Sequence, residues 1–498
     1  MAHRGQFAVL KKRIEETGYC SIPLSDGWIL NYHEKLPVVF NPHTDVLLLG
    51  YVWQIEADRM SPDQAVKSIS DFQKLKEEEE SWCGRYVLIM DKKVYLDASG
   101  LFGVFYSNAG ISSDLSVLVK ELGLERCSWR PNDVMRWYPG PGTPYREIKR
   151  ILPSQVYDLD TNSLSFRNIL ADSIPSFQNE EELIESFVSL FCASLRNMQK
   201  RFKDRKFLLA LTGGYDSRTL LALSLRAGID FDCYTLEHDY MPLGDIDYPP
   251  LLCKLAGKNY QYYRRNQANY SLKREEEYLE HLHWMQMEQD RTFYAYGQYQ
   301  ELAEKYGPIV LLRSGVWEIA QEYDRRAVGE DGDVESVLNY YELAKHSEES
   351  GAFEQFFQWT DQHPVAVSAA NRYFWEQRCG SWIAESEHGF DIYEDIISLQ
   401  PVNSRKLITM LLCFPVEERM TKYHQAKITA RIVPEFRDVP YGKNEDYTTD
   451  KIIKLKKTAA KMVRRIRKIG IRRTINMYLH IAADKRKTKQ ANEANRPG

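Results

Sequence analysis

The sequence lacks most features that would set it apart from ordinary globular proteins. Its eight cysteines are scattered along 498 residues with no Cys-x-x-Cys pair, so neither a disulfide framework nor a zinc site is expected. No apolar run approaches the length that spans a bilayer. The first twenty residues, MAHRGQFAVLKKRIEETGYC, lack the apolar core of a signal peptide. We therefore expect a cytoplasmic protein with reduced thiols.

Internal repeats are also missing, and the composition is that of a soluble chain. Hydrophobic residues make up 43% of the sequence, charged residues 27% and aromatic residues 12%. A chain of this length can form two or three domains, each with its own core.

Acidic residues are nearly absent from one C-terminal segment. Between Lys451 and Lys489 there are fifteen Lys or Arg residues and one acid, Asp484; the whole chain has a net charge of −4, so the remainder carries about −18. The cations alternate with aliphatic residues at roughly helical spacing. We expect a basic amphipathic tail that binds an anionic surface, a partner protein or the acidic body. Nucleic acid is disfavoured because Tyr478 is the single Phe, Trp or Tyr there.

Hydrophobic patterns divide the rest of the chain into a β-rich part and an α/β part. Short runs of β-branched and aromatic residues at 46–53, 84–91 and 93–107 predict strands. From about residue 179, a helical pattern precedes the compact apolar strand KFLLAL, and the next helix ends at Gly228. This alternation of helices with buried strands predicts a parallel sheet, and therefore an α/β multidomain protein.

The stretch KFLLALTGGYDSRTLLAL passes from a strand through two glycines into a helix. Such a turn presents backbone N–H groups at the positive end of the helix, where phosphate binds well. Gly213 and Gly214 allow close approach of a phosphate, and Thr212 and Ser217 supply hydroxyl groups. Asp216 is a carboxylate beside the expected phosphates, which makes sense if it holds Mg²⁺.

Arg218 follows and would steady the charge of a leaving group. The spacing matches neither the Gly-x-x-x-x-Gly-Lys loop nor the Gly-x-Gly-x-x-Gly loop. A tight strand-to-helix turn without any ligand remains an alternative interpretation of the same residues.

The stretch resembles the Ser-Gly-Gly-x-Asp-Ser pyrophosphatase loop of the asparagine synthetase family, with Thr212 in place of the first Ser. Other segments resemble that family in the same order, over roughly residues 40 to 445: 96–107, 143–160, 235–263, 313–326, 401–420 and 440–444. The resemblance implies ATP contacts at Leu211, Thr212, Gly213, Gly214, Asp216, Ser217, Arg218, Thr235 and Gly315.

The resemblance also implies a domain order and a reaction. Residues 1–170 would form a glutaminase-like αββα domain, 171–448 an ATP-pyrophosphatase domain with helical extensions, and 449–498 the basic tail. A substrate carboxylate would be activated with ATP and Mg²⁺ as an acyl-adenylate, and an amine would then displace AMP. The partners would be a small-molecule or peptide carboxylate and an amine donor, in the biosynthesis of a peptide, natural product or surface polysaccharide.

Two departures from the family pattern affect this expectation. Glutaminases of the family expose a Cys as first residue, whereas this sequence begins Met-Ala-His-Arg-Gly. We therefore expect no glutaminase activity, which resembles the β-lactam synthetase and lasso peptide cyclase branches. The family's Asp-Glu pair reads Trp317-Glu318 here, so Glu318, or alternatively Glu322, would complete the metal site with Asp216.

Further candidate residues have structural alternatives. Lys443 lies where the family often places a catalytic Lys, although a surface turn explains it equally. Asp245 and Asp247 lie at an expected acidic helix start, where capping explains at least one of them. Arg372 and Arg378 would hold a substrate carboxylate if their helix faces the cleft; packing in the core is the plainer interpretation.

Two other functions stay open from the sequence alone. The same type of loop adenylates RNA bases in tRNA-modifying enzymes, and the basic tail would then contact RNA. Alternatively, the chain is a degenerate binding protein without catalysis, which Trp317 and the missing first Cys favour.

Overall fold

A computed structural model describes residues 3–441 apart from 128–130, 132–133, 136, 238–241, 265–292 and 330–331, together with Ile471. The described residues up to Tyr441 belong to one compact unit, Met1–Gly442. The predicted boundary at residue 170 lies inside this unit and stays a prediction. Lys443 and, except for Ile471, the predicted tail at 449–498 lie outside the described residues.

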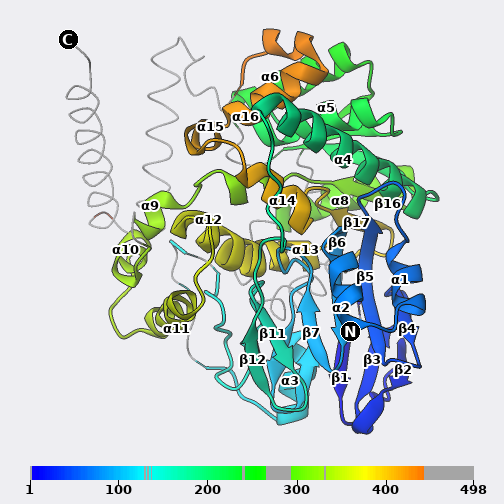
Figure 1. The fold of residues 1–498 in the computed structure, drawn as a ribbon, viewed down its shortest axis with the longest axis vertical. Helices are drawn as coiled ribbons and strands as arrows, with labels where there is room; N and C mark the ends of the chain where they lie inside the picture. The colour runs from blue at the N-terminus through cyan, green and yellow to red at the C-terminus, as the bar shows by residue number, and fades with distance from the viewer. Residues whose placement is uncertain are drawn as a thin grey trace. The chain divides into compact units, whose positions relative to one another are not determined.

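Two six-stranded antiparallel sheets form the first part of the chain (Figure 1). Their strand orders are β10-β8-β9-β1-β3-β2 and β12-β11-β7-β6-β5-β4. The strands are β1 (Phe7–Leu10), β2 (Tyr19–Pro23), β3 (Ile29–His33), β4 (Val38–Asn41), β5 (Val46–Gln54), β6 (Trp82–Met90), β7 (Lys93–Leu96), β8 (Phe105–Ser107), β9 (Gly110–Ser112), β10 (Lys149–Arg150), β11 (Gln155–Asp158) and β12 (Ser163–Phe166). We call these two sheets and their helices the sandwich.

The sandwich has helices on both outer faces. Phe7 and Leu30 of the first sheet pack against Leu47 and Val87 of the second, so the two sheets share an apolar core. Helices α1 (Pro62–Ser68) and α2 (Phe72–Glu79) cover the outer face of the second sheet, and α3 (Leu115–Leu122) covers the first. The order of layers is therefore helix, sheet, sheet, helix.

A five-stranded parallel sheet follows, in the order β15-β14-β13-β16-β17. Its strands are β13 (Lys206–Ala210), β14 (Asp232–Leu236), β15 (Tyr260–Tyr263), β16 (Ile309–Leu312) and β17 (Ile396–Leu399). The prediction of an α/β chain with one parallel sheet is confirmed. Strand β17 was not anticipated, because it lies in a stretch whose other patterns are helical.

Helices alternate with the strands of this sheet, and α9 to α12 form a separate apolar cluster beside it. They are α4 (Glu180–Arg201), α5 (Tyr215–Ala227), α6 (Leu243–Ala256), α8 (Phe293–Tyr306), α9 (Arg325–Val328), α10 (Val334–Tyr340), α11 (Glu348–Gln362), α12 (Ala369–Tyr373), α13 (Ala384–His388), α14 (Arg405–Leu412), α15 (Val416–Thr421) and α16 (Tyr423–Ile432). Shorter turns are η1 (Ser25–Gly27), η3 (Trp317–Ala320) and η5 (Pro434–Asp438), and η4 (Phe374–Ile383) is a π-helix. No described helix has the length and apolar character that crossing a membrane requires.

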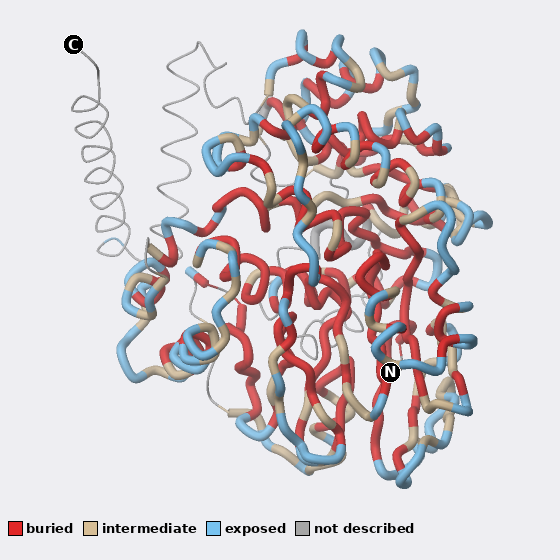
Figure 2. Tube along the Cα trace, viewed as in Figure 1, coloured by how far each residue is buried: buried red, intermediate tan, exposed pale blue. Residues whose placement is uncertain are grey.

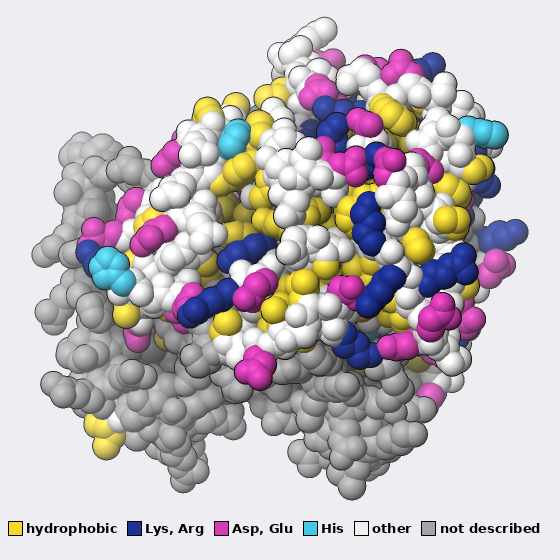
Figure 3. Space-filling model, turned by 90° about the horizontal axis from the view of Figure 1, so that it is seen from below, with side chains coloured by type: hydrophobic (Ala, Val, Ile, Leu, Met, Phe, Trp, Pro, Cys, Tyr) yellow, Lys and Arg dark blue, Asp and Glu magenta, His cyan; other side chains and the backbone are white. Residues whose placement is uncertain are grey.

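The core extends across the boundary between the sandwich and the parallel sheet. Tyr51, Trp53 and Cys83 of the sandwich belong to the same buried cluster as Phe187 of α4 and Leu209 of β13. Figure 2 shows the corresponding continuity of buried backbone along the strands. On the face drawn in Figure 3, acidic and basic side chains are interspersed, with apolar side chains between them.

Candidate functional site

The glycine turn lies at the switch point of the parallel sheet. The strands β13, β14 and β15 run outward on one side, and β16 and β17 on the other, so the chain order reverses between β13 and β16. Ligands of such sheets bind in the crevice at the carboxyl ends of the strands on either side of this point. The segment 211–217 follows β13 and the segment 313–318 follows β16, so both flank this crevice.

Bonds within the turn hold it in a defined shape. The Ser217 hydroxyl accepts from the Thr212 N–H at 3.1 Å and lies 3.0 Å from the Thr212 hydroxyl. The Gly214 N–H donates to that same Thr212 hydroxyl at 3.3 Å. Gly214 is the N-cap of α5, and no described side chain caps this helix. The N–H groups of the first turn are therefore available to an anion.

Gly213 is required for a different reason from the one expected. A Cβ on Gly213 would lie 2.6 Å from the carbonyl oxygen of Gly244, at the start of α6, whereas a Cβ on Gly214 would approach nothing described within 3.4 Å. The Gly213 N–H donates to Asp245 Oδ1 at 2.8 Å. Gly213 thus permits α6 to pack on the turn, and Asp245 braces the turn from α6, whereas Asp247 is exposed.

Leu211 and Thr235 are bonded to each other at the ends of β13 and β14. Leu211 donates its N–H to the Tyr234 carbonyl at 2.9 Å, and its own carbonyl accepts from the Thr235 hydroxyl at 2.6 Å. Both residues are buried. The Leu211 backbone and the Thr235 hydroxyl therefore extend the pairing of β13 and β14, and the expected ATP contacts of these two residues stay predictions.

Asp216 lies in the first turn of α5 and is held by three side chains. Its Oδ1 accepts from Gln321 Nε2 at 2.6 Å and from Gln425 Nε2 at 2.7 Å. Its Oδ2 lies 3.5 Å from Lys422 Nζ, and the Asp216 side chain stays 16% exposed. The carboxylate is thus oriented by two amides, while Oδ2 has only one long cationic contact in the described part of the chain.

Glu318 approaches Asp216 from the other side of the crevice. Burial, and then the neighbouring Asp216 carboxylate, raise the pKa of Glu318 to about 8. Among the described residues, Glu318 Oε2 is buried with no hydrogen-bond partner. Trp317, which replaces the family's Asp, is buried against Phe187 and Phe191 of α4, with ring centroids 6.0 and 5.8 Å away. Trp317 therefore packs in the hydrophobic core.

Asp216 and Glu318 suit one hard divalent cation. Two adjacent carboxylates repel each other until a cation lies between them, and Glu318 Oε2 has an unused acceptor position. Mg²⁺ is typically held by one or two carboxylates together with phosphate oxygens and water. The described residues contain no cluster of three or more His, Cys, Asp or Glu side chains that would hold a metal by itself, so phosphate oxygens would have to complete this site.

Arg218 is bonded to backbone carbonyls of the segment after η5, and its expected contact with a leaving group stays a prediction. Its guanidinium is buried and donates to the carbonyls of Val439 and Pro440, at 2.6 Å each. It also lies 3.9 Å from the ring centroid of Tyr441. Arg218 thus ties α5 to the segment after η5 through both terminal nitrogens of its guanidinium, whereas its Nε is buried with no hydrogen-bond partner among the described residues.

Gly315, Glu322 and Lys443 are the remaining residues that the sequence placed at the site. The Gly315 N–H donates to Gln400 Oε1 at 2.8 Å, three residues before Glu318. Glu322 has other partners, since its Oε1 accepts from the Ser368 hydroxyl at 2.6 Å and lies 3.9 Å from Arg419 Nη1. The alternative that Glu322 completes the metal pair is therefore not supported. Lys443 lies outside the described residues.

The two arginines of the aromatic stripe differ in position. Arg372 is buried and donates to Glu376 and to the carbonyls of Thr360 and His363, so it packs within the fold. Arg378 lies on the π-helix η4, 4.5 Å from the ring centroid of Trp382 and 3.9 Å from Asp324 Oδ2. π-helical turns are rare and often occur near functional sites.

Four residues around Asp216 were missed in the sequence. They are Gln321, Lys422, His424 and Gln425. Lys422 has a positive φ of 62° between α15 and α16, a conformation that side chains other than Gly rarely adopt and that tends to occur at functional sites. Burial lowers the pKa of His424 to about 4. No sequence motif marks these residues, because the approach of α16 to α5 brings them together.

Comparison with known proteins gives little further support. No family model and no curated protein matches the chain. Solved structures with some likeness include a glutamine-dependent NAD⁺ synthetase from Acinetobacter baumannii in complex with ADP, at 17% identity, 35% of this chain, 31% of that chain and a TM-score of 0.20. This chain thus covers about a third of that protein's length.

Two others are an NMN synthetase from Francisella tularensis, at 13% identity over 48% of this chain and 94% of that one, and an NH₃-dependent NAD synthetase from Campylobacter jejuni, at 11% over 49% and 96%. Their TM-scores are 0.19 and 0.20. Values this low establish neither the fold nor the function of this chain, which rest on its own sequence and geometry.

Proposed function

We propose that the protein is an ATP-dependent amide-bond synthetase that resembles the asparagine synthetase family and forms AMP and pyrophosphate. One observation carries the proposal. The uncapped N-terminus of α5 and the pair Asp216 and Glu318 meet at the switch point of the parallel sheet. A phosphate-binding helix end beside two carboxylates is the arrangement that a magnesium nucleotide requires.

The reaction would proceed in two displacements. A substrate carboxylate oxygen forms a bond to the α-phosphorus of ATP, and the bond to the bridging oxygen breaks, which releases pyrophosphate. An amine then attacks the acyl carbon and expels AMP, and the ammonium proton passes to a base. The α5 N–H groups and Lys422 would hold phosphate oxygens, and Asp216 and Glu318 would hold Mg²⁺. When bound, the ion would neutralise charge that develops on the departing pyrophosphate.

The layered sandwich supports a glutaminase-like domain that has no glutaminase function. His3 lies 2.9 Å from Asp114, and Arg4 donates to the carbonyls of Glu394 and Ile396, so the residues that precede β1 are buried in polar contacts. Cys20 lies on β2, where it is exposed. We propose that the amine donor is a substrate amine, which an assay with glutamine as the nitrogen source would test.

An exchange assay tests the proposed activity. Purified protein is incubated with ATP, Mg²⁺, labelled pyrophosphate and a panel of carboxylic acids, and incorporation of label into ATP is measured. We expect acid-dependent exchange in the wild type and a loss on the order of 100-fold or more in Asp216→Asn. Asp247→Asn, on exposed α6, is the matched control and should keep its activity. Equal activity of Asp216→Asn and the wild type would remove Asp216 from the site.

A non-catalytic binding protein is the second candidate. Two observations favour it. Trp317 stands where the asparagine synthetase family has an Asp, and three side chains already contact the Asp216 carboxylate oxygens. No exchange with any acid, combined with measurable ATP binding by calorimetry, would support this candidate over the synthetase.

A further inference from the structure

The segment after β16 is held from behind by a chain of buried side chains. The Gln400 amide uses both of its ends. Its Oε1 accepts from the Gly315 N–H at 2.8 Å, and its Nε2 donates to Glu387 Oε1 at 2.9 Å. If the Gln400 amide were flipped, its NH₂ group would face the Gly315 N–H, donor against donor. These contacts therefore determine one orientation of the amide. Gln400 and Glu387 are both buried.

Glu387 also accepts a hydrogen bond from the residue that follows β16. The same Oε1 atom accepts from Arg313 Nη1 at 2.9 Å. Arg313 lies directly after β16, two residues before Gly315. Glu387 therefore holds the segment 313–318 at two points, once through Arg313 and once through Gln400.

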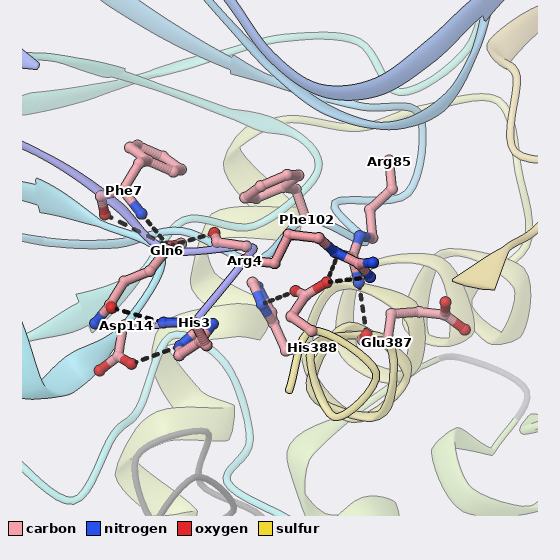
Figure 4. A network of polar contacts seen from close by, with 12 residues as sticks. His3, Arg4, Gln6, Phe7, Arg85, Phe102, Asp114, Glu387 and His388 are labelled. Carbon is pink, nitrogen blue, oxygen red and sulfur yellow. Dashed lines mark hydrogen bonds and ion pairs between the residues drawn. The ribbon is translucent and has the colours of Figure 1, made fainter. Parts of the chain in front are cut away.

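A residue of the sandwich, Arg85, also contacts Glu387. Arg85 of β6 donates through Nη1 to the Glu387 carbonyl at 2.5 Å, and through Nη2 to Asp391 (Figure 4). Arg4 lies 3.8 Å from Asp391, and a Cβ on Gly5 would lie 2.1 Å from Asp391 Oδ2. The residues just before β1 and Arg85 in β6 therefore contact the stretch 387–391, which carries Glu387.

We propose that Gln400 and Glu387 are positioning residues that set the segment 313–318 against the nucleotide, and that Arg85 makes the sandwich their anchor. The inference rests on the proposed function, since it concerns the segment that carries Glu318. In this arrangement the sandwich acts as a structural part of the synthetase site. Small displacements of such a segment reduce turnover strongly, because the reacting groups must be held in a narrow range of positions.

A matched pair of variants tests the positioning role. Gln400→Met removes both amide contacts at similar volume. Gln377→Met is the control, since Gln377 is equally buried and exchanges two bonds with Gly140. We expect Gln400→Met to reduce the kcat of pyrophosphate exchange by about tenfold or more while the KM for ATP stays within about threefold. It should also speed hydrogen exchange in the peptide covering 313–320. Gln377→Met should change neither quantity.

A second variant separates positioning from simple packing. In Gln400→Glu the new carboxyl can donate to Glu387 only when protonated, so its activity relative to the wild type should rise as the pH is lowered from 8 to 6. The charged and titratable groups that interact with Glu387 are Arg313, Arg85, Tyr234 and Tyr299. Arg85→Met should also speed exchange in 313–320, because the anchor is lost.

The outcomes are distinguishable from failure of the proposed function. If the wild type shows no pyrophosphate exchange, the synthetase proposal fails, and the hydrogen-exchange measurement still decides whether Gln400 holds the segment. Unchanged protection of 313–320 in Gln400→Met, or the same change in Gln377→Met, would overturn the positioning role. If the activity of Gln400→Glu relative to the wild type does not rise as the pH is lowered, this result also contradicts the positioning role.

Discussion

At the scale of single residues, environment decides what a side chain does more than its chemical type. Arg218 and Thr235 carry groups suited to phosphate, yet the structure uses them on backbone carbonyls. Lys422 and Gln425, which belong to no recognised motif, contact Asp216 instead. A buried donor that already has its acceptors cannot also bind a ligand without leaving those acceptors unpaired.

Arg218→Met should destabilise the protein rather than affect only a chemical step. The change leaves the carbonyls of Val439 and Pro440 without their donors, which we expect to cost about 2–4 kcal/mol in the free energy of unfolding. Urea unfolding measures this quantity, and hydrogen exchange should show loss of protection in 434–441. Arg226→Met, on the exposed last turn of α5, is the control. Normal stability with lost activity would favour the original expectation for Arg218.

His424 should contribute to acid lability. Burial lowers its pKa to about 4 in the folded state, from about 6.5 when unfolded. The unfolded state therefore binds the proton first, and stability is lost as the pH falls from about 6.5 towards 4. His424→Gln should lose about 1–2 kcal/mol less than the wild type between pH 7 and pH 5. Chemical denaturation at the two pH values measures this, with exposed His346→Gln as control; equal losses would contradict the expectation.

At the scale of elements, the turn between β13 and α5 is shaped by its contact with α6 as well as by any ligand. Asp245 bonds the Gly213 N–H, and the Gly244 carbonyl lies where a side chain on residue 213 would be. The two adjacent glycines thus have different physical requirements, although they look equivalent in the sequence.

Gly213→Ala and Gly214→Ala should therefore behave differently. The first places a Cβ 2.6 Å from a backbone oxygen, and we expect a loss of about 2–3 kcal/mol as α6 shifts. The second adds a Cβ in ordinary contact with the Thr212 hydroxyl, at 3.4 Å, and should cost about 1 kcal/mol or less. Urea unfolding of the two variants compares them directly. A larger loss in Gly214→Ala would mean that α6 does not restrict the turn.

At the scale of the whole unit, the sandwich and the parallel sheet share contacts that neither could satisfy alone. Trp53 donates to the Ser194 hydroxyl at 2.9 Å, Trp375 to the Ala98 carbonyl at 2.7 Å, and Asn403 to the Gly84 carbonyl at 2.7 Å. Through these bonds and the shared apolar cluster, the sandwich and the parallel sheet pack against each other.

A chain limited to residues 171–498 should therefore fail to fold on its own. Its exposed apolar surface would include the faces of α4 and η4 that now contact the sandwich, so we expect aggregation. Coexpression with residues 1–170 should restore soluble protein, which size-exclusion chromatography and circular dichroism would measure. Cooperative unfolding of the isolated 171–498 segment would contradict this expectation.

The sequence by itself determined the strand-turn-helix at 206–228, because apolar runs, glycines and end residues act over a few neighbours. It also indicated the parallel sheet and the place of Asp216 within the turn. Only the tertiary structure decided which other groups meet there: Glu318, one of the two alternatives in the sequence, is the carboxylate beside Asp216, and Lys422 just before α16 and Gln425 within it contact Asp216. It also decided that Arg218 and Thr235 donate to backbone carbonyls. The reason is physical, since local propensity follows neighbours in the chain, whereas burial and hydrogen-bond pairing depend on residues more than two hundred positions away.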